Sequence, residues 1–95
     1  MQVDNSVTIS GLLHHIKSGK KSGKYLLFSI KQETPWGDGT TRRDFLVSRA
    51  FLPEIQDRIQ SLPEGTPLKV TGSLHSSLGS GELYIYVEGV EVLPA

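Results

Sequence analysis

Hydrophobic residues recur at every second position along most of this chain, and this alternation constrains its fold more than any other feature. Leu26, Phe28 and Ile30 share one parity, while polar residues such as Ser29 and Lys31 fall on the other. Because successive side chains of a strand point to opposite faces, such a stretch predicts a half-buried β-strand. Similar stretches predict five strands, at about residues 7–14, 24–31, 42–49, 68–74 and 83–92.

The period changes once, between the third and fourth of these stretches. Leu52, Ile55, Ile59 and Leu62 recur at intervals of three and four residues, and a proline lies near each end of the pattern. Proline is tolerated in the first turn of a helix and ends one elsewhere. The segment therefore predicts an amphipathic helix of ten residues.

Glycines interrupt the strands and the connections. Gly11 predicts a bend or bulge in the first strand, and Gly89 predicts a bulge in the last, whose inward residues are expected to be Leu83, Ile85 and Val87. The glycine, serine and lysine stretch 18–24 is expected to be a basic turn. The segment 34–41 is expected to be a loop that carries the single tryptophan, Trp36, and residues 78–81 a hairpin turn.

The chain has 95 residues, which is enough for one hydrophobic core, so residues 1–95 are expected to form one domain. An open sheet of five short strands would leave two exposed edges, whereas a closed sheet removes them and lets the helix cover one end. The order of three strands, one helix and two strands therefore predicts an all-β, five-stranded barrel with one short helix between strands 3 and 4. This arrangement is the oligonucleotide-binding fold.

Composition excludes several classes of protein. With 37% hydrophobic and 21% charged residues, the chain has the composition of a folded globular domain. It has no cysteine, which excludes disulfides and thiol chemistry and is typical of a reducing compartment. No signal sequence or membrane-spanning stretch is evident, so we expect a cytoplasmic protein that does not enter a membrane.

The formal net charge is zero, but the charges are unevenly distributed. The segment 14–49 contains eight basic and three acidic residues and carries a net charge of +5, which the rest of the chain balances at −5. Because phosphate binding requires a local positive surface, this distribution is compatible with a nucleic-acid partner. The alternative interpretation of the lysines at 17–24 is a solvated loop without a ligand.

Catalytic and metal sites are not indicated. His14 and His15 are adjacent on a predicted strand and point to opposite faces, so with His75 they make a poor metal site. The chain has no GxSxG turn, no P-loop and no pair of carboxylates in an apolar run. We expect no enzyme activity and no cofactor.

Four stretches resemble the bacterial single-stranded DNA-binding protein family, and together they extend over most of the chain. They are NSVTISGLL at 5–13, GKYLLFSIKQETPW at 23–36, RDFLVSRAF at 43–51 and PEGTPLKVTGSLHS at 63–76. The resemblance implies largely sequence-independent binding of single-stranded DNA in replication, repair or recombination. It also implies that Trp36, Phe45 and Phe51 stack on bases. The family's fourth stacking aromatic and its acidic tail have no counterpart here, and tail-less primosomal replication proteins, which act in replication restart, are a close alternative.

A sequence-tolerant binder of single strands needs flat rings for the bases and a basic track for the phosphates. Tyr84 and Tyr86 alternate with the inward residues of the last strand, so they face outward and are candidates for stacking or for a subunit interface. The complete set of predicted nucleic-acid-binding residues is Lys17, Lys20, Lys21, Lys24, Lys31, Trp36, Arg42, Arg43, Phe45, Arg49, Phe51, Tyr84 and Tyr86.

One barrel of this size offers a short track for a strand. We therefore expect a homodimer or homotetramer, with the first strand or the outer tyrosines at the interface. Replication or restart proteins are further expected partners, and RNA is an alternative ligand. The competing function is a protein-interaction module that uses Phe45, Tyr84 and Tyr86 to bind another protein without nucleic acid.

Overall fold

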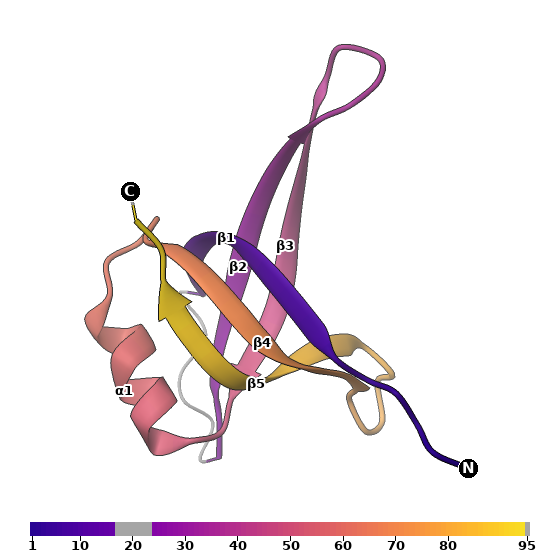
Figure 1. Ribbon diagram of the computed structural model, residues 1–95, viewed down its shortest axis with the longest axis vertical. Coiled ribbons are helices and arrows are strands. Elements are labelled where there is room, and N and C mark those ends of the chain that lie inside the picture. Colours follow the sequence, from indigo (N-terminus) through magenta and orange to yellow (C-terminus); the bar gives the residue numbers. More distant parts are fainter. Residues whose placement is uncertain (17–23, 95) are drawn as a thin grey trace.

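The computed structural model describes residues 1–16 and 24–94, and within these residues it contains five strands and one helix. In chain order they are β1 (Val7–His15), β2 (Leu26–Pro35), β3 (Thr41–Ala50), α1 (Pro53–Ser61), β4 (Pro67–Ser76) and β5 (Leu83–Val92). The strands close into a barrel in the order β1-β2-β3-β5-β4, and α1 lies beside one end of it (Figure 1). The predicted barrel with a helix between its third and fourth strands is confirmed over these residues.

β1 closes the barrel because it pairs with two strands. Val7–Leu12 pair with β4, and Leu12–His15 pair with β2, all antiparallel. Gly11 lies at this change of partner, where the sequence predicted a bend. A Cβ atom at Gly11 would lie 2.5 Å from the carbonyl oxygen of Lys31, so glycine permits β1 and β2 to approach closely there.

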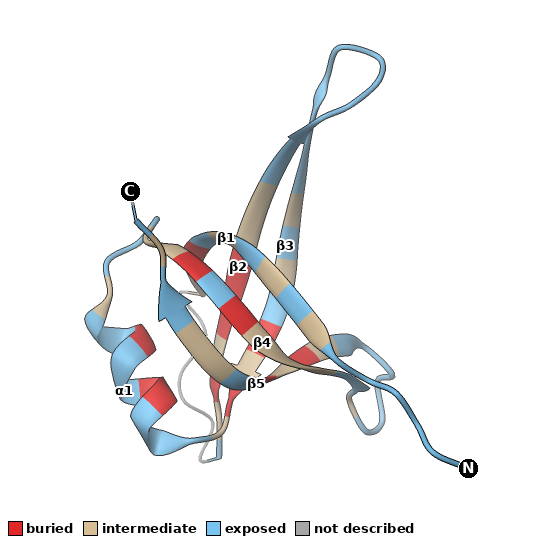
Figure 2. Cartoon of the chain, viewed as in Figure 1, coloured by how far each residue is buried: buried red, intermediate tan, exposed pale blue. Residues whose placement is uncertain are grey.

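The core fills the barrel and extends to the inner side of α1 (Figure 2). Leu13, Phe28, Ile30 and Val87 are almost completely buried, as their parity predicted. The other buried hydrophobic residues are Leu26, Ala50, Ile55, Ile59, Leu68, Val70 and Ile85. Within residues 1–16 and 24–94, no helix is both long enough and apolar enough to cross a bilayer.

The helix is shorter than predicted by one residue and buries one residue that its pattern did not single out. It begins at Pro53 and ends before Pro63, and it turns Ile55, Gln56 and Ile59 inward. The amide of Gln56 donates a hydrogen bond of 2.9 Å to the carbonyl oxygen of Ala50, at the end of β3. This bond fixes the start of α1 against the barrel.

Two hairpins extend beyond the barrel. The β2–β3 hairpin projects farthest (Figure 1). It reduces the loop predicted at 34–41 to Trp36–Thr40, because Thr34, Pro35 and Thr41 are paired in the strands. The β4–β5 hairpin is the second. Its register shifts between Thr71 and Gly72, which pair with Gly89 and Val87, so the strand is irregular where the sequence predicted a bulge at Gly89.

The prediction that Leu83 points into the core is wrong, since this side chain is 64% exposed. β3 and β5 pair in parallel over Ser48–Ala50 and Ile85–Val87, and they diverge before these residues. Leu83 therefore lies beyond the closed part of the barrel, where its parity no longer gives burial.

Candidate nucleic-acid interface

Arg49 lies at the centre of a group of aromatic side chains on the outer face of the barrel. Its guanidinium carbon is 4.6 Å from the centre of the Tyr25 ring and 4.0 Å from that of the Tyr84 ring. Parallel pairing of β3 with β5 brings Arg49 opposite Tyr86, and antiparallel pairing with β2 brings it opposite Leu27. A ring from β5 and one from the residue before β2 thus converge on one arginine of β3.

A second group of contacts extends this surface. The Phe51 ring lies 5.2 Å from that of Tyr25 and 5.1 Å from that of Tyr86, and it is nearly parallel to the latter, with an interplanar angle of 21°. The His75 ring is 6.0 Å from both Tyr84 and Tyr86. These separations are in the range of favourable aromatic packing. We call the surface formed by Tyr25, Arg49, Phe51, His75, Tyr84 and Tyr86 the aromatic platform.

The platform confirms that Tyr84 and Tyr86 face outward, opposite in parity to Ile85 and Val87. Two members were not among the predicted site residues. Tyr25 precedes the buried Leu26, and His75 of β4 is opposite in parity to the buried Leu68 and Val70, so alternation places both on outer faces. Their parity was visible in the sequence, but their meeting with β3 and β5 required the strand order.

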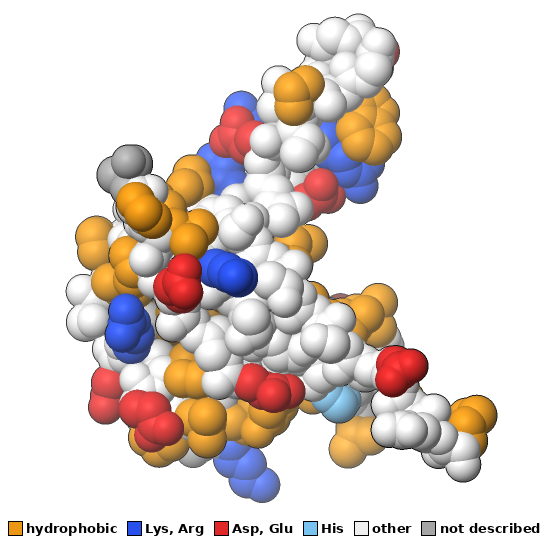
Figure 3. Space-filling view, in the orientation of Figure 1, with side chains coloured by type: hydrophobic (Ala, Val, Ile, Leu, Met, Phe, Trp, Pro, Cys, Tyr) orange, Lys and Arg blue, Asp and Glu red, His pale blue; other side chains and the backbone are white. Residues whose placement is uncertain are grey.

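Trp36 and Phe45 lie outside the platform. Trp36, at the tip of the β2–β3 hairpin, is 53% exposed, and the guanidinium carbon of Arg42 lies 5.1 Å from its ring. Phe45 is 49% exposed and packs at 5.1 Å from the ring of His14 on β1. The outer-face position predicted for Phe45 is confirmed. Figure 3 shows hydrophobic and basic surface side by side on this hairpin, with a hollow below it.

The turn that carries Trp36 is held by its own hydrogen bonds. The Trp36 amide donates to the Thr40 carbonyl oxygen at 2.8 Å, and the Thr40 hydroxyl donates to an Asp38 carboxylate oxygen at 2.6 Å. This hydroxyl and the Thr40 amide lower the pKa of Asp38. The turn therefore presents Trp36 in a defined position, away from the platform.

Most of the predicted basic residues on β2 and β3 are paired with carboxylates. Lys31 Nζ lies 2.9 Å from Glu33, Arg42 Nε lies 3.2 Å from Asp44, and Arg43 Nε lies 3.8 Å from the same Glu33. The hydrogen bond from Lys31, together with the nearby positive charges, lowers the pKa of Glu33. The local excess of positive charge inferred from the sequence is thus partly neutralised on this hairpin.

His14 is held in place by a carboxylate from the loop after α1. Glu64 accepts hydrogen bonds from the amide of His15 at 2.7 Å and, at 2.8 Å, pairs with Nδ1 of His14. Both contacts lower the pKa of Glu64, and the amide makes the larger contribution. The pair supports the contact between His14 and Phe45. In residues 1–16 and 24–94, no three His, Asp or Glu side chains are grouped closely enough to hold a metal ion.

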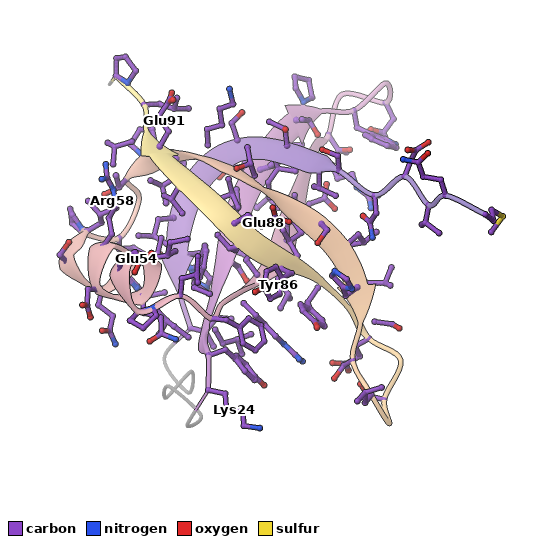
Figure 4. The ribbon with its side chains drawn as sticks, turned by 60° about the horizontal axis from the view of Figure 1, so that its bottom comes forward. Lys24, Glu54, Arg58, Tyr86, Glu88 and Glu91 are labelled. Atoms are coloured by element: carbon purple, nitrogen blue, oxygen red, sulfur yellow. The ribbon has the colours of Figure 1, made fainter. Side chains whose placement is uncertain are left out.

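The remaining predicted lysines divide into two groups. Lys24 is exposed and lies just before β2. In Figure 4 it projects from the bottom of the molecule, nearer to Tyr86 than to Glu91, which lies near the other end of β5. Lys17, Lys20 and Lys21 lie outside the described residues.

The barrel order β1-β2-β3-β5-β4, the helix after β3 and the outward rings define the class of the fold, an oligonucleotide-binding barrel. Neither protein-family models nor curated protein sequences give a match to this chain. Several solved structures, however, match its fold. A small single-stranded DNA-binding protein from Mycoplasma pneumoniae superposes with a TM-score of 0.73 at 16% identity, covering 94% of this chain and 93% of that one.

Two further solved structures share the fold over nearly their whole length. An SSB from Plasmodium falciparum, in complex with ssDNA, gives a TM-score of 0.72 at 18% identity, covering 99% of this chain and 98% of that one. The N-terminal domain of PriB from Thermoanaerobacter tencongensis, a dimeric structure, gives 0.60 at 23% identity, covering 96% and 98%. At these identities the likeness establishes the fold, and the fold alone does not establish the function.

Proposed function

We propose that this protein binds single-stranded DNA, largely without sequence preference and without catalysis. The aromatic platform is the observation that supports this most strongly. It gathers five rings and a guanidinium on one outer face, from the residue before β2, the end of β3 and the residue after it, β4 and β5. Every base has a flat apolar face, so rings arranged on a surface bind bases of any sequence.

Four platform rings are half-buried and the fifth, His75, is exposed, so none is fully covered, which is the state that a stacking surface requires. Tyr25, Phe51 and Tyr86 hold one another in place, so little side-chain entropy is lost when a base stacks on them. Each stacked base contributes about 1–3 kcal/mol. Two or three such contacts give useful affinity once several phosphates are also neutralised.

The structural neighbours agree with this proposal. They are a small single-stranded DNA-binding protein, an SSB in complex with ssDNA and a PriB domain, and the first two match the function that the sequence resemblance implied. Replication, repair or recombination is the proposed process, with replication restart as the alternative. The preference for DNA over RNA, the recruitment of replication or restart proteins and a cytoplasmic location remain predictions.

A homodimer or homotetramer is also proposed. The first half of β1 pairs with β4 on one side, and β2 comes close to β1 only from Ser10 onward, so the other edge of Val7–Ile9 is left for a second copy. Sedimentation equilibrium of the free protein tests this directly.

One observation favours the alternative function, a protein-interaction module. Phe45 and Val47 of β3 and Leu74 and Leu83 of the β4–β5 hairpin are exposed and line one groove. Exposed apolar surface of this kind often binds another protein. The nucleic-acid proposal is preferred because the platform combines its rings with a cation.

Binding of a fluorescently labelled oligo-thymidine, followed by anisotropy at low and moderate salt, tests the proposal. We expect binding of the single strand, much weaker binding of duplex DNA, and a steep decrease in affinity with salt. Phe51→Leu and Tyr86→Leu keep apolar volume but remove a ring, and each should weaken binding about 5- to 150-fold. Val3→Ala, in the exposed N-terminal segment, is the control and should bind like the wild type.

Absence of single-strand binding by the folded wild-type protein would refute the proposal and place the interaction module first. Equal affinity of Tyr86→Leu and Val3→Ala would show that the strand binds elsewhere than on the platform.

A further inference from the structure

Arg49 differs from the other cations on the outer face of β2 and β3. Lys31, Arg42 and Arg43 each lie within 4 Å of a carboxylate oxygen. Arg49 has no such neighbour in the part of the chain that the structure describes. Its charge is therefore not compensated by an acid there, although the side chain is half-buried.

The guanidinium is nevertheless held in one position. It lies over the rings of Tyr25 and Tyr84, and its Nη2 donates a hydrogen bond of 3.2 Å to Ser77 Oγ in the β4–β5 turn. Its Nε is buried and has no hydrogen-bond partner among the described residues. A buried donor without a partner costs about 1–3 kcal/mol, so a site that tolerates one calls for a functional explanation.

The positions of the rings restrict how Arg49 meets a ligand. Tyr25 and Tyr84 cover its faces, so a base has no room to stack on the guanidinium. A guanidinium carries its terminal N–H donors in its own plane, as a fork that matches two oxygens of one phosphate, and the rings do not lie in that plane. Ser77 Oγ accepts the Arg49 hydrogen bond, which leaves its own hydroxyl hydrogen free to donate to the same ligand.

We infer that Arg49 and Ser77 form a fixed binding site for one backbone phosphate of the strand, while the rings around them take the bases. The inference rests on the proposed function and deepens it. It separates base contacts from phosphate contacts within the platform, and it makes Arg49 the dominant cation of β3, ahead of Arg42 and Arg43. The charges of Arg42 and Arg43 are already partly compensated by a carboxylate at Nε, so each attracts a phosphate less strongly.

A guanine edge is the second source of the same chemistry. Its O6 and N7 atoms also accept two hydrogen bonds from an arginine. Phosphate is favoured because it supplies a negatively charged partner, which Arg49 does not have among the described residues, and because it is present at every nucleotide.

The test compares charge-removing variants by the salt dependence of oligo-thymidine affinity, since thymine offers no guanine edge. Arg49→Met should bind about 10-fold or more weakly. It should also reduce the slope of log affinity against log salt by about 0.7, the value for one phosphate of a single strand. Arg49→Lys keeps the charge and should restore the slope, but not the full affinity, because lysine lacks the planar fork.

Two variants are matched to Arg49→Met in charge. Arg58→Met removes an exposed arginine of α1 and should leave the slope unchanged. Arg43→Met removes an arginine of β3 that is paired with Glu33, and its effect on affinity should be smaller than that of Arg49→Met. Ser77→Ala should weaken binding a few-fold without a change in slope.

Thermal melting of each variant shows whether it is folded. If Arg49→Met does not fold, Arg49→Lys and Ser77→Ala still test the site in the folded protein. Equal slopes for Arg49→Met and Arg58→Met, with a wild type that binds, would overturn this inference and leave the proposed function intact. A preference of the wild type for dG over dT that disappears in Arg49→Met would assign Arg49 to a guanine edge and overturn the phosphate site. A wild type that does not bind would refute both.

Discussion

Gly72 is the position at which a single methyl group should disturb the molecule most. It lies on β4 at the register shift opposite β5. A Cβ atom there would overlap the carbonyl oxygen of Tyr86 and lie 2.9 Å from its carbonyl carbon. Both atoms belong to the backbone, so no side-chain rotation relieves the contact. In Gly72→Ala, β4 and β5 must separate next to the aromatic platform.

The cost follows from the contacts that are lost. Overpacking typically costs about 1–3 kcal/mol. One or two weakened hydrogen bonds of the β4–β5 ladder add about 1 kcal/mol each. The total is about 2–5 kcal/mol, and its middle value of about 3–4 kcal/mol is a large part of the stability of a domain of this size. Since 1 kcal/mol lowers the melting temperature of such a domain by about 4–8 °C, Gly72→Ala should melt about 12–30 °C below the wild type.

Thermal unfolding followed by circular dichroism measures this difference, and the chain offers a matched control. A Cβ atom at Gly37 meets nothing within 4 Å among the described residues, and the φ angle of Gly37 is not positive. Gly37→Ala should therefore melt at or slightly above the temperature of the wild type. If Gly72→Ala melted within a few degrees of Gly37→Ala, the close approach of β4 and β5 would be wrong.

Two further predictions concern the ends of the barrel. Gln56→Leu removes the donor to the buried Ala50 carbonyl, so it should lower the free energy of unfolding, measured in urea, by about 1–3 kcal/mol. Gln60 is exposed on the same helix, and Gln60→Leu should have little effect. Equal unfolding midpoints for the two variants would contradict the role of Gln56. The pKa of Glu64 is lowered in the folded protein, so its stabilising contribution is present above the ordinary pKa of 4.5 and is lost as the pH falls through the folded value. Melting temperatures across this range should fall more steeply for the wild type than for Glu64→Gln, and parallel curves would refute the contribution of Glu64.

The parts of the fold that depend on local pattern could be predicted from the sequence. Alternation identified the strands and the core residues Leu26, Phe28 and Ile30, and the change of period identified α1. Both signals reflect which face of an element meets the core. They fail where an element leaves the core, as at Leu83, whose strand begins before the barrel closes.

The platform could be predicted only in part, because it depends on pairing between distant strands. The outward parity of Tyr84 and Tyr86 is a local property. Their contacts with Phe51 and Arg49 follow from the parallel register of β3 and β5, which no local pattern encodes. The family resemblance grouped Trp36 and Phe45 with Phe51 as stacking rings, but in the structure both lie apart from Phe51.

The double pairing of β1 has a consequence for how the chain folds. β2 and β3 are joined by a short turn, and such hairpins form in about 1–10 μs. The pairing of Val7 with Gly72, by contrast, closes a loop of most of the chain, and contacts of this kind place β-barrels among the slow folders. Arg49 belongs to the hairpin that forms early and Tyr25 directly precedes it, whereas Tyr84 and Tyr86 join them only when β5 docks on β3. We therefore expect the platform to be complete last, so that a chain still folding has no finished surface on which to hold a ligand.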